Sequence, residues 1–215
     1  MAKRIPGTIW YIASRFQLYI ADGLDVKTTA LASGIEMVLI TLAGILVALL
    51  FATQTLIEYH ISPFILVIVF ILGLIVIHPK VIQWFLHRKN VDVRGLNYKF
   101  ILQGILAYVL SWIFGGMVLF ETGNIIYPFS IENLPYFITI WALVGIISTI
   151  LFFSPSNLGI TEIGISLLLS KLVPSSIAVL IAVSTRILLI IFEIIWAGLF
   201  LWIKLPDKSP LTQKD

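Results

Sequence analysis

The chain has 215 residues, of which 60% are hydrophobic and only 12% are charged, and its formal net charge is +3. A soluble domain of this length carries about 25% charged residues and could not bury so much apolar surface, so the composition excludes a soluble globular protein. There is no cysteine, which excludes disulfide scaffolds and thiolate chemistry. The sequence therefore predicts an all-α polytopic membrane protein.

Five stretches are long and apolar enough to cross a bilayer, whose hydrocarbon core needs about 20 residues of helix. A sixth stretch, residues 157–173, is weaker because it carries Glu162 and Lys171 and is bracketed by Pro155 and Pro174. We expect it to cross as an interrupted or partly re-entrant helix, which gives about six transmembrane segments. The five stronger stretches are residues 30–51, 61–77, 100–120, 134–153 and 177–203.

The basic residues gather on one side of these spans. Twelve of the 14 lysines and arginines lie before the first span, between the second and the third, or after the last, whereas residues 52–60 and 121–133 contain none. Positive charge in short connections marks the cytoplasmic side. We therefore expect a multi-pass protein of the cell membrane with both termini in the cytoplasm, a single membrane domain over residues 1–205 and a short cytoplasmic tail over residues 206–215.

Two shorter segments are expected near the membrane surface. Residues 8–20 have apolar side chains at helical spacing together with Arg15, so they could lie in the interface or enter the membrane as half of a hairpin. Residues 81–86 are flanked by basic residues and predict a second interfacial helix that attracts anionic lipid. A basic loop without lipid specificity is the alternative for that segment.

Four ionisable residues are expected inside the membrane: Glu36, Glu162, Arg186 and Glu193. Each costs about 2.5–3.5 kcal/mol near the bilayer centre by insertion scales, which makes such residues candidates for function. Arg186 and Glu193 are seven residues apart and therefore share one face of a helix, which we expect to line the bundle interior. These residues predict either ion pairs that lock helices together or a polar track for a charged group.

The segment from Ser154 to Gly159 places a proline, two serines, an asparagine and a glycine between two apolar stretches. Irregular backbone inside a membrane must be covered by protein or water. Ser156 or Asn157 could cap the next helix, whose free N–H groups would attract an anion such as a headgroup phosphate; a plain loop before a capped helix is the alternative. The expected substrate-binding residues are Pro155, Ser156, Asn157, Gly159, Glu162, Arg186, Glu36, Glu193 and Arg15.

The two ends of the chain are similar at an offset of 149 residues. Pro6 then aligns with Pro155, and Glu36 aligns with Thr185, next to Arg186. The corresponding spans are expected to run in opposite directions, as in inverted repeats whose interrupted helices surround a midplane site; chance similarity is the alternative. We expect Glu36 and Arg186 to pair across the repeat interface, because either charge is costly to leave alone.

At these residues the sequence resembles the flippase-like transmembrane region of bacterial lysyl-phosphatidylglycerol synthases and its free-standing relatives. Members carry a proline-glycine-x-x-tryptophan motif followed by an arginine, similar to residues 6–10 and Arg15, and a glutamate in the next span, similar to Glu36. Their late motif of proline, two glycines, leucine and glycine, with a glutamate three residues on, is similar to residues 155–162. The arginine of their last span is similar to Arg186.

The resemblance covers essentially the whole chain, with Ser156 and Asn157 in place of the family's two glycines and with fewer leading spans than members have, as in an N-terminally short member. It implies transfer of phospholipids or polyprenyl-linked lipids between leaflets, often beside a glycosyltransferase or another lipid-modifying enzyme. A non-transporting subunit that anchors such an enzyme is the alternative. We expect no enzymatic activity, cofactor, metal or nucleic-acid partner, since HExxH, GxSxG and P-loop motifs are absent.

Overall fold

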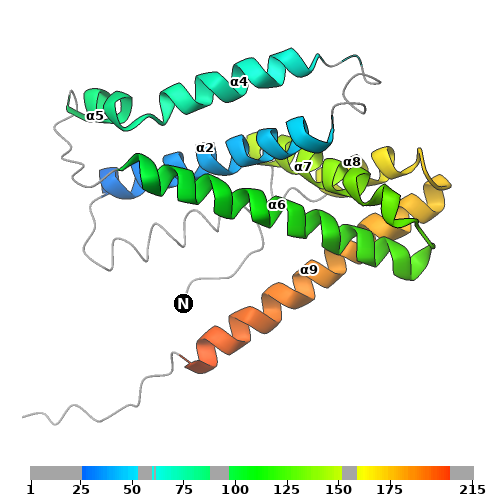
Figure 1. Ribbon diagram of the computed structural model, residues 1–215. Helices are drawn as coiled ribbons and strands as arrows, with labels where there is room; N and C mark the ends of the chain where they lie inside the picture. Colours follow the sequence, from blue (N-terminus) through cyan, green and yellow to red (C-terminus); the bar gives the residue numbers. More distant parts are fainter. Residues whose placement is uncertain (1–25, 53–59, 61, 88–96, 152–158, 204–215) are drawn as a thin grey trace, which may run out of the picture.

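The computed structural model describes residues 26–52, 60, 62–87, 97–151 and 159–203, and every regular element in these ranges is a helix (Figure 1). The expected helical fold is therefore confirmed for the described part of the chain. The segment 8–20 and the tail 206–215 lie outside it. The elements are α2 (Val26–Phe51), α4 (Pro63–Val76), α5 (Pro79–His87), α6 (Tyr98–Ile126), the 3-10 turn η1 (Ile131–Asn133), α7 (Leu134–Ile150), α8 (Ile160–Leu169) and α9 (Ser175–Ile203).

Among the described residues, four helical segments are long and apolar enough to cross a membrane, and two further apolar helices, α4 and α8, are shorter. At 1.5 Å per residue, the 10 residues of α8 extend only about 15 Å, roughly half of a hydrocarbon core. All six predicted stretches contain a helix, and four of them are candidate spans. The candidate spans are Val26–Phe51, Tyr98–Ile126, Ile131–Ile150 and Ser175–Leu199.

The helix ends follow local sequence signals. The Asn97 side chain accepts a hydrogen bond from the Lys99 N–H (3.2 Å) and starts α6. Prolines in the first turns of α4 and α7 fit because the first helical N–H groups have no partner within the helix. The α6–α7 connection is closed by Asn124, whose side-chain oxygen accepts from the Phe129 N–H at 2.8 Å.

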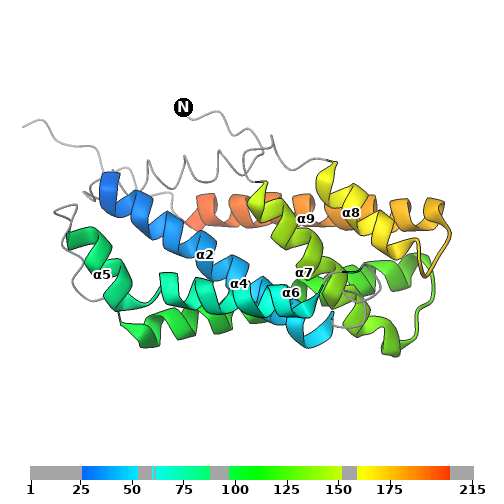
Figure 2. The same ribbon diagram turned by 90° about the horizontal axis from the view of Figure 1, so that it is seen from above.

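The helices form an elongated bundle in which α7 and α8 occupy only part of the length of α9 (Figure 2). In both views α8 runs back along α9 in the opposite direction, from a start part way along the bundle to the end where α9 begins. The Tyr136 hydroxyl donates to the Leu168 carbonyl (2.9 Å) and joins the start of α7 to the end of α8. The start of α8 therefore lies beside the middle of α9.

Two large neighbouring hydrophobic cores hold the described part of the bundle, beside a smaller cluster between α2 and α7. One joins α2, α6 and α7 with the α4–α5 corner, and the other joins α6, α7, α8 and α9. Between α6 and α7, two tryptophans pack reciprocally on glycines, Trp112 on Gly145 and Trp141 on Gly115. Because glycine has no side chain, each large ring can lie directly against the facing backbone.

Substituting Gly145 by alanine is expected to destabilise the protein by about 1–3 kcal/mol, the usual cost of overpacking a core. An added Cβ would overlap the six-membered ring of Trp112, which is itself buried. Thermal unfolding in detergent measures the change. Gly34→Ala is the matched control, because no atom of the described residues lies within 4 Å of a Cβ built there. Equal melting temperatures of the two variants would contradict this account of the packing.

Much of the apolar surface faces outward, as a lipid environment requires. The helix α4 has no buried residue, and side chains such as Phe64 (77% exposed) project away from the bundle. Every side chain from Ile191 to Leu199 in α9 is exposed as well. Water could not solvate this much apolar surface, so these faces are suited to contact with lipid or other apolar helices.

Candidate functional site

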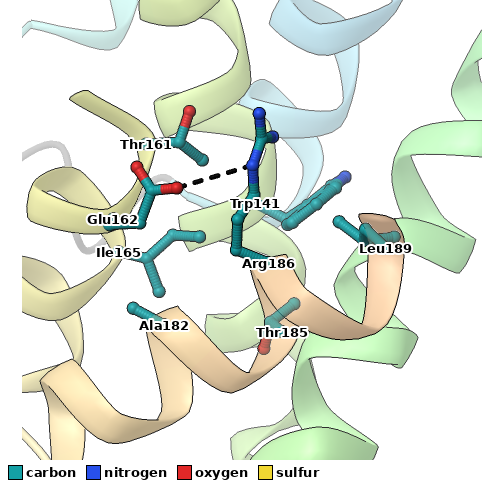
Figure 3. Close-up of a pocket in the computed structure, with 8 residues that line it drawn as sticks. All are labelled: Trp141, Thr161, Glu162, Ile165, Ala182, Thr185, Arg186 and Leu189. Carbon is teal, nitrogen blue, oxygen red and sulfur yellow. Dashed lines mark ion pairs between the residues drawn. The ribbon is translucent and has the colours of Figure 1, made fainter. Parts of the chain in front are cut away.

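The charged residues Glu162 and Arg186 come together where the short helix α8 begins. Arg186 is the twelfth of the 29 residues of α9, and its Nε lies 3.5 Å from Oε1 of Glu162 (Figure 3). Both side chains are partly covered, with exposed fractions of 31% for Arg186 and 17% for Glu162. The pair thus places two opposite charges between apolar helices, halfway along a candidate span.

Glu162 also holds the first turn of α8. Its Oε2 accepts a hydrogen bond from the Gly159 N–H at 2.8 Å, and Gly159 is the N-cap of the helix. Gly159 has φ = +91°, a backbone conformation that residues other than glycine rarely adopt. One carboxylate therefore joins the start of α8 to the middle of α9, with one oxygen for each.

A small cavity of about 20 Å³ adjoins the ion pair, enough for about one water molecule. Its walls combine the charged pair with one aromatic ring and with hydroxyl and aliphatic groups (Figure 3). The hydroxyl of Thr161 lies 3.1 Å from that of Ser148, which joins the polar wall to the end of α7. The lining residues are Trp141, Thr161, Glu162, Ile165, Ala182, Thr185, Arg186 and Leu189.

A second polar contact connects α2 to α6. The Tyr108 hydroxyl donates to Oε1 of Glu36 at 2.8 Å, and both side chains are partly buried. Four residues further along each helix, Trp112 Nε1 donates to the Ile40 carbonyl at 3.0 Å. These two bonds, one helical turn apart, fix the packing of α6 on α2 around the carboxylate.

The structure brings together only part of the predicted site. Glu162 and Arg186 are in contact and Gly159 starts the same helix, whereas Glu36 bonds to Tyr108 of α6. The pairing of Glu36 with Arg186 stays a prediction. Pro155, Ser156, Asn157 and Arg15 lie outside the described residues.

One expectation about this region was wrong. Glu193 lies on the same helix face as Arg186 by its spacing but is exposed and does not face the bundle interior, because the ten residues of α8 reach only as far as the middle of α9. The helix α8 begins after Gly159, where the Glu162 carboxylate accepts from the cap N–H, and the expected capping residues Ser156 and Asn157 lie outside the described residues.

Several residues of the site were missed by sequence reasoning. Tyr108 and Trp141 lie in apolar stretches where an aromatic residue is adequately explained by packing. Thr161 and Ser148 carried a weak signal, since hydroxyl residues close to Glu162 or near the end of a span are common. Within the described ranges, no three histidine, aspartate or glutamate side chains are grouped so that they could hold a metal ion.

The fold and the site define a helical protein with four candidate membrane spans and a charged pair near the middle of the last one. Comparison with known proteins finds no matching family model, no similar curated protein and no similar solved structure.

Proposed function

We propose that the protein moves lipids with an anionic headgroup, either phospholipids or polyprenyl-linked lipids, between the leaflets of a membrane. The observation that carries this proposal is the Glu162–Arg186 pair beside a small cavity, near the middle of a largely apolar helix. A charged pair at that depth is costly and is therefore a candidate for function. The headgroup would pass along this site while the lipid chains stay in the bilayer.

The chemistry of the pair suits a phosphate. A guanidinium donates in a planar fork that matches phosphate oxygens, and Arg186 would attract the headgroup in this way. Glu162 accepts the Gly159 N–H with one oxygen and forms an ion pair with Arg186 through the other, so a phosphate would compete with this carboxylate for both groups. Positioning and charge are enough for the transfer, and no covalent bond needs to form or break.

The six-span topology and the inverted repeat belong to the same proposal. The short helices α4 and α8 would be the second and fifth crossings, and α8 with the preceding motif would form an interrupted crossing. Two features of α8 support this. Its 10 residues extend across only about half of a hydrocarbon core, and it starts beside the middle of α9 (Figure 2). Transporters with inverted repeats place substrate sites at such half-helices. The cytoplasmic position of both termini and the cell-membrane location rest on the distribution of basic residues.

The alternative is a non-transporting subunit that anchors a glycosyltransferase or another lipid-modifying enzyme. The exposed apolar faces of α4 and of Ile191–Leu199 favour it, since a partner's helices could pack there. In that case substitution of Glu162 or Arg186 would impair assembly with the enzyme and not lipid movement. Co-purification with such an enzyme would support this alternative.

Lipid exchange in proteoliposomes tests the proposed function. Headgroup-labelled phosphatidylglycerol in the inner leaflet should become accessible to an impermeant quencher when the wild-type protein is present. Glu162→Gln and Arg186→Gln each remove one charge of this partly covered ion pair and are each expected to lower the exchange rate about tenfold or more.

Gln83→Asn serves as the control, because Gln83 is an exposed polar residue of α5 away from the cavity. Folded wild-type protein that leaves the inner-leaflet label protected would contradict the flippase proposal and favour the anchoring subunit. Exchange that is unchanged in both charge variants would contradict the role of the pair.

A further inference from the structure

Trp141 lies where the cavity meets the rest of the bundle. Its ring lines the cavity beside Arg186, and its indole nitrogen points away from Glu162 (Figure 3). The same ring packs against both hydrophobic cores. The position of this one side chain therefore sets one wall of the site.

Gly115 of α6 supports the far edge of that ring. A Cβ built on Gly115 would overlap Nε1 of Trp141 and would lie 2.6 Å from Cε2 and 2.7 Å from Cδ1. These atoms belong to the five-membered part of the indole, the edge that is directed at α6. A side chain at position 115 would therefore push the ring away from α6 and toward the cavity, which has room for about one water molecule.

We infer that Gly115 is a positioning residue of the proposed lipid site: by leaving room for the indole of Trp141 on α6, it keeps the ring from filling the cavity beside Glu162 and Arg186, so that a headgroup phosphate can approach the pair. This inference rests on the proposed function. Gly115 touches no part of the cavity itself and acts only through the ring.

Gly145 shows what a purely structural role would look like. It supports Trp112 in the same way between the same two helices, but Trp112 does not line the cavity. Gly145→Ala and Gly115→Ala therefore introduce the same atom in equivalent packing, and only the second is adjacent to a wall of the site.

Because the chain has no cysteine, a single cysteine at Thr161 can report on the cavity. Gly115→Ala should slow the reaction of this cysteine with a small thiol reagent about tenfold, while Gly145→Ala leaves it unchanged. In a Trp141→Phe background, which lacks the five-membered ring, Gly115→Ala should no longer matter, as expected for two residues that act through one contact. Lipid exchange should likewise be slower in Gly115→Ala than in Gly145→Ala, and Gly115→Ala should have no further effect in the Trp141→Phe background. Misplacement of a group near a site by about 1 Å can lower a rate by up to about 100-fold.

Labelling and exchange separate the two proposals. Slower labelling in Gly115→Ala that persists unchanged in the Trp141→Phe background would overturn the positioning role. Equal slowing by Gly145→Ala, or no slowing at all, would overturn it as well. If labelling behaves as expected but the wild-type protein moves no lipid, the placement of Trp141 stands, and the proposed function and the role of Gly115 in it both fail.

Discussion

Replacing Arg186 by glutamate is expected to abolish lipid exchange and to lower the melting temperature of the protein. The change sets a second carboxylate beside Glu162, whose Oε1 now lies 3.5 Å from the arginine Nε. The cost in stability should fall between about 1 kcal/mol for an exposed pair and about 3–5 kcal/mol for a buried pair that loses one partner, since this pair is partly covered. Melting temperature and exchange rate are measured on the same reconstituted protein.

A second substitution that restores the stability and exchange lost in Arg186→Glu identifies the residue with which Arg186 pairs. Restoring opposite charges with Glu162→Arg should recover part of the stability and of the exchange, because the two side chains are neighbours across α8 and α9. Glu36→Arg offers the same charge from α2 and tests the pairing predicted from the repeat. Rescue by Glu36→Arg alone would contradict the role given to the observed pair.

Substituting Tyr108 by phenylalanine should destabilise the contact between α2 and α6 by about 1.5–3 kcal/mol, the range for a hydrogen bond to a charged group. The change removes only the hydroxyl that donates to Glu36 at 2.8 Å and leaves the ring in place. Thermal unfolding measures the loss. The effect follows from the carboxylate, whose Oε1 loses the hydroxyl that donates to it.

Tyr136→Phe provides the control for this prediction. The Tyr136 hydroxyl donates to a neutral carbonyl, that of Leu168, at 2.9 Å, and its loss should cost only about 0.5–1.5 kcal/mol. A melting temperature that falls more in Tyr136→Phe than in Tyr108→Phe would show that the charge of Glu36 does not strengthen the α2–α6 contact.

The long helices could be predicted because a run of apolar residues with few charges is a direct signal of a membrane helix. The short helices were harder, since α8 ends at Leu169, four residues before the predicted stretch ends. Ser170 and the residues that follow form a turn before α9, and Pro174 lies just before the start of that helix. Apolar composition alone does not locate such a turn.

Glu162 and Arg186 were predicted as site residues, but their contact with each other was not. A short connection between two helices favours antiparallel packing of α8 on α9. The contact between Glu162 and Arg186 could therefore have been predicted from the sequence. The contact of Glu36 with Tyr108 could not have been predicted in this way. The two residues are 72 positions apart in the sequence, and an uncharged tyrosine in an apolar stretch gives no signal of a polar contact. The seven-residue spacing placed Glu193 on the right face of α9 but could not show where the covering helix ends.

A bulky group attached at the α8–α9 site tests most directly whether lipid passes there. A single cysteine at Thr161 lines the cavity, and one at Ile163 lies on the lipid-facing side of the same helix, where the native side chain is 65% exposed. Both variants are modified with a bulky maleimide in detergent, checked by mass and reconstituted with labelled phosphatidylglycerol. We expect modification at position 161 to stop lipid exchange and modification at position 163 to leave it unchanged. Undiminished exchange after complete modification at position 161 would contradict a lipid path through the α8–α9 site.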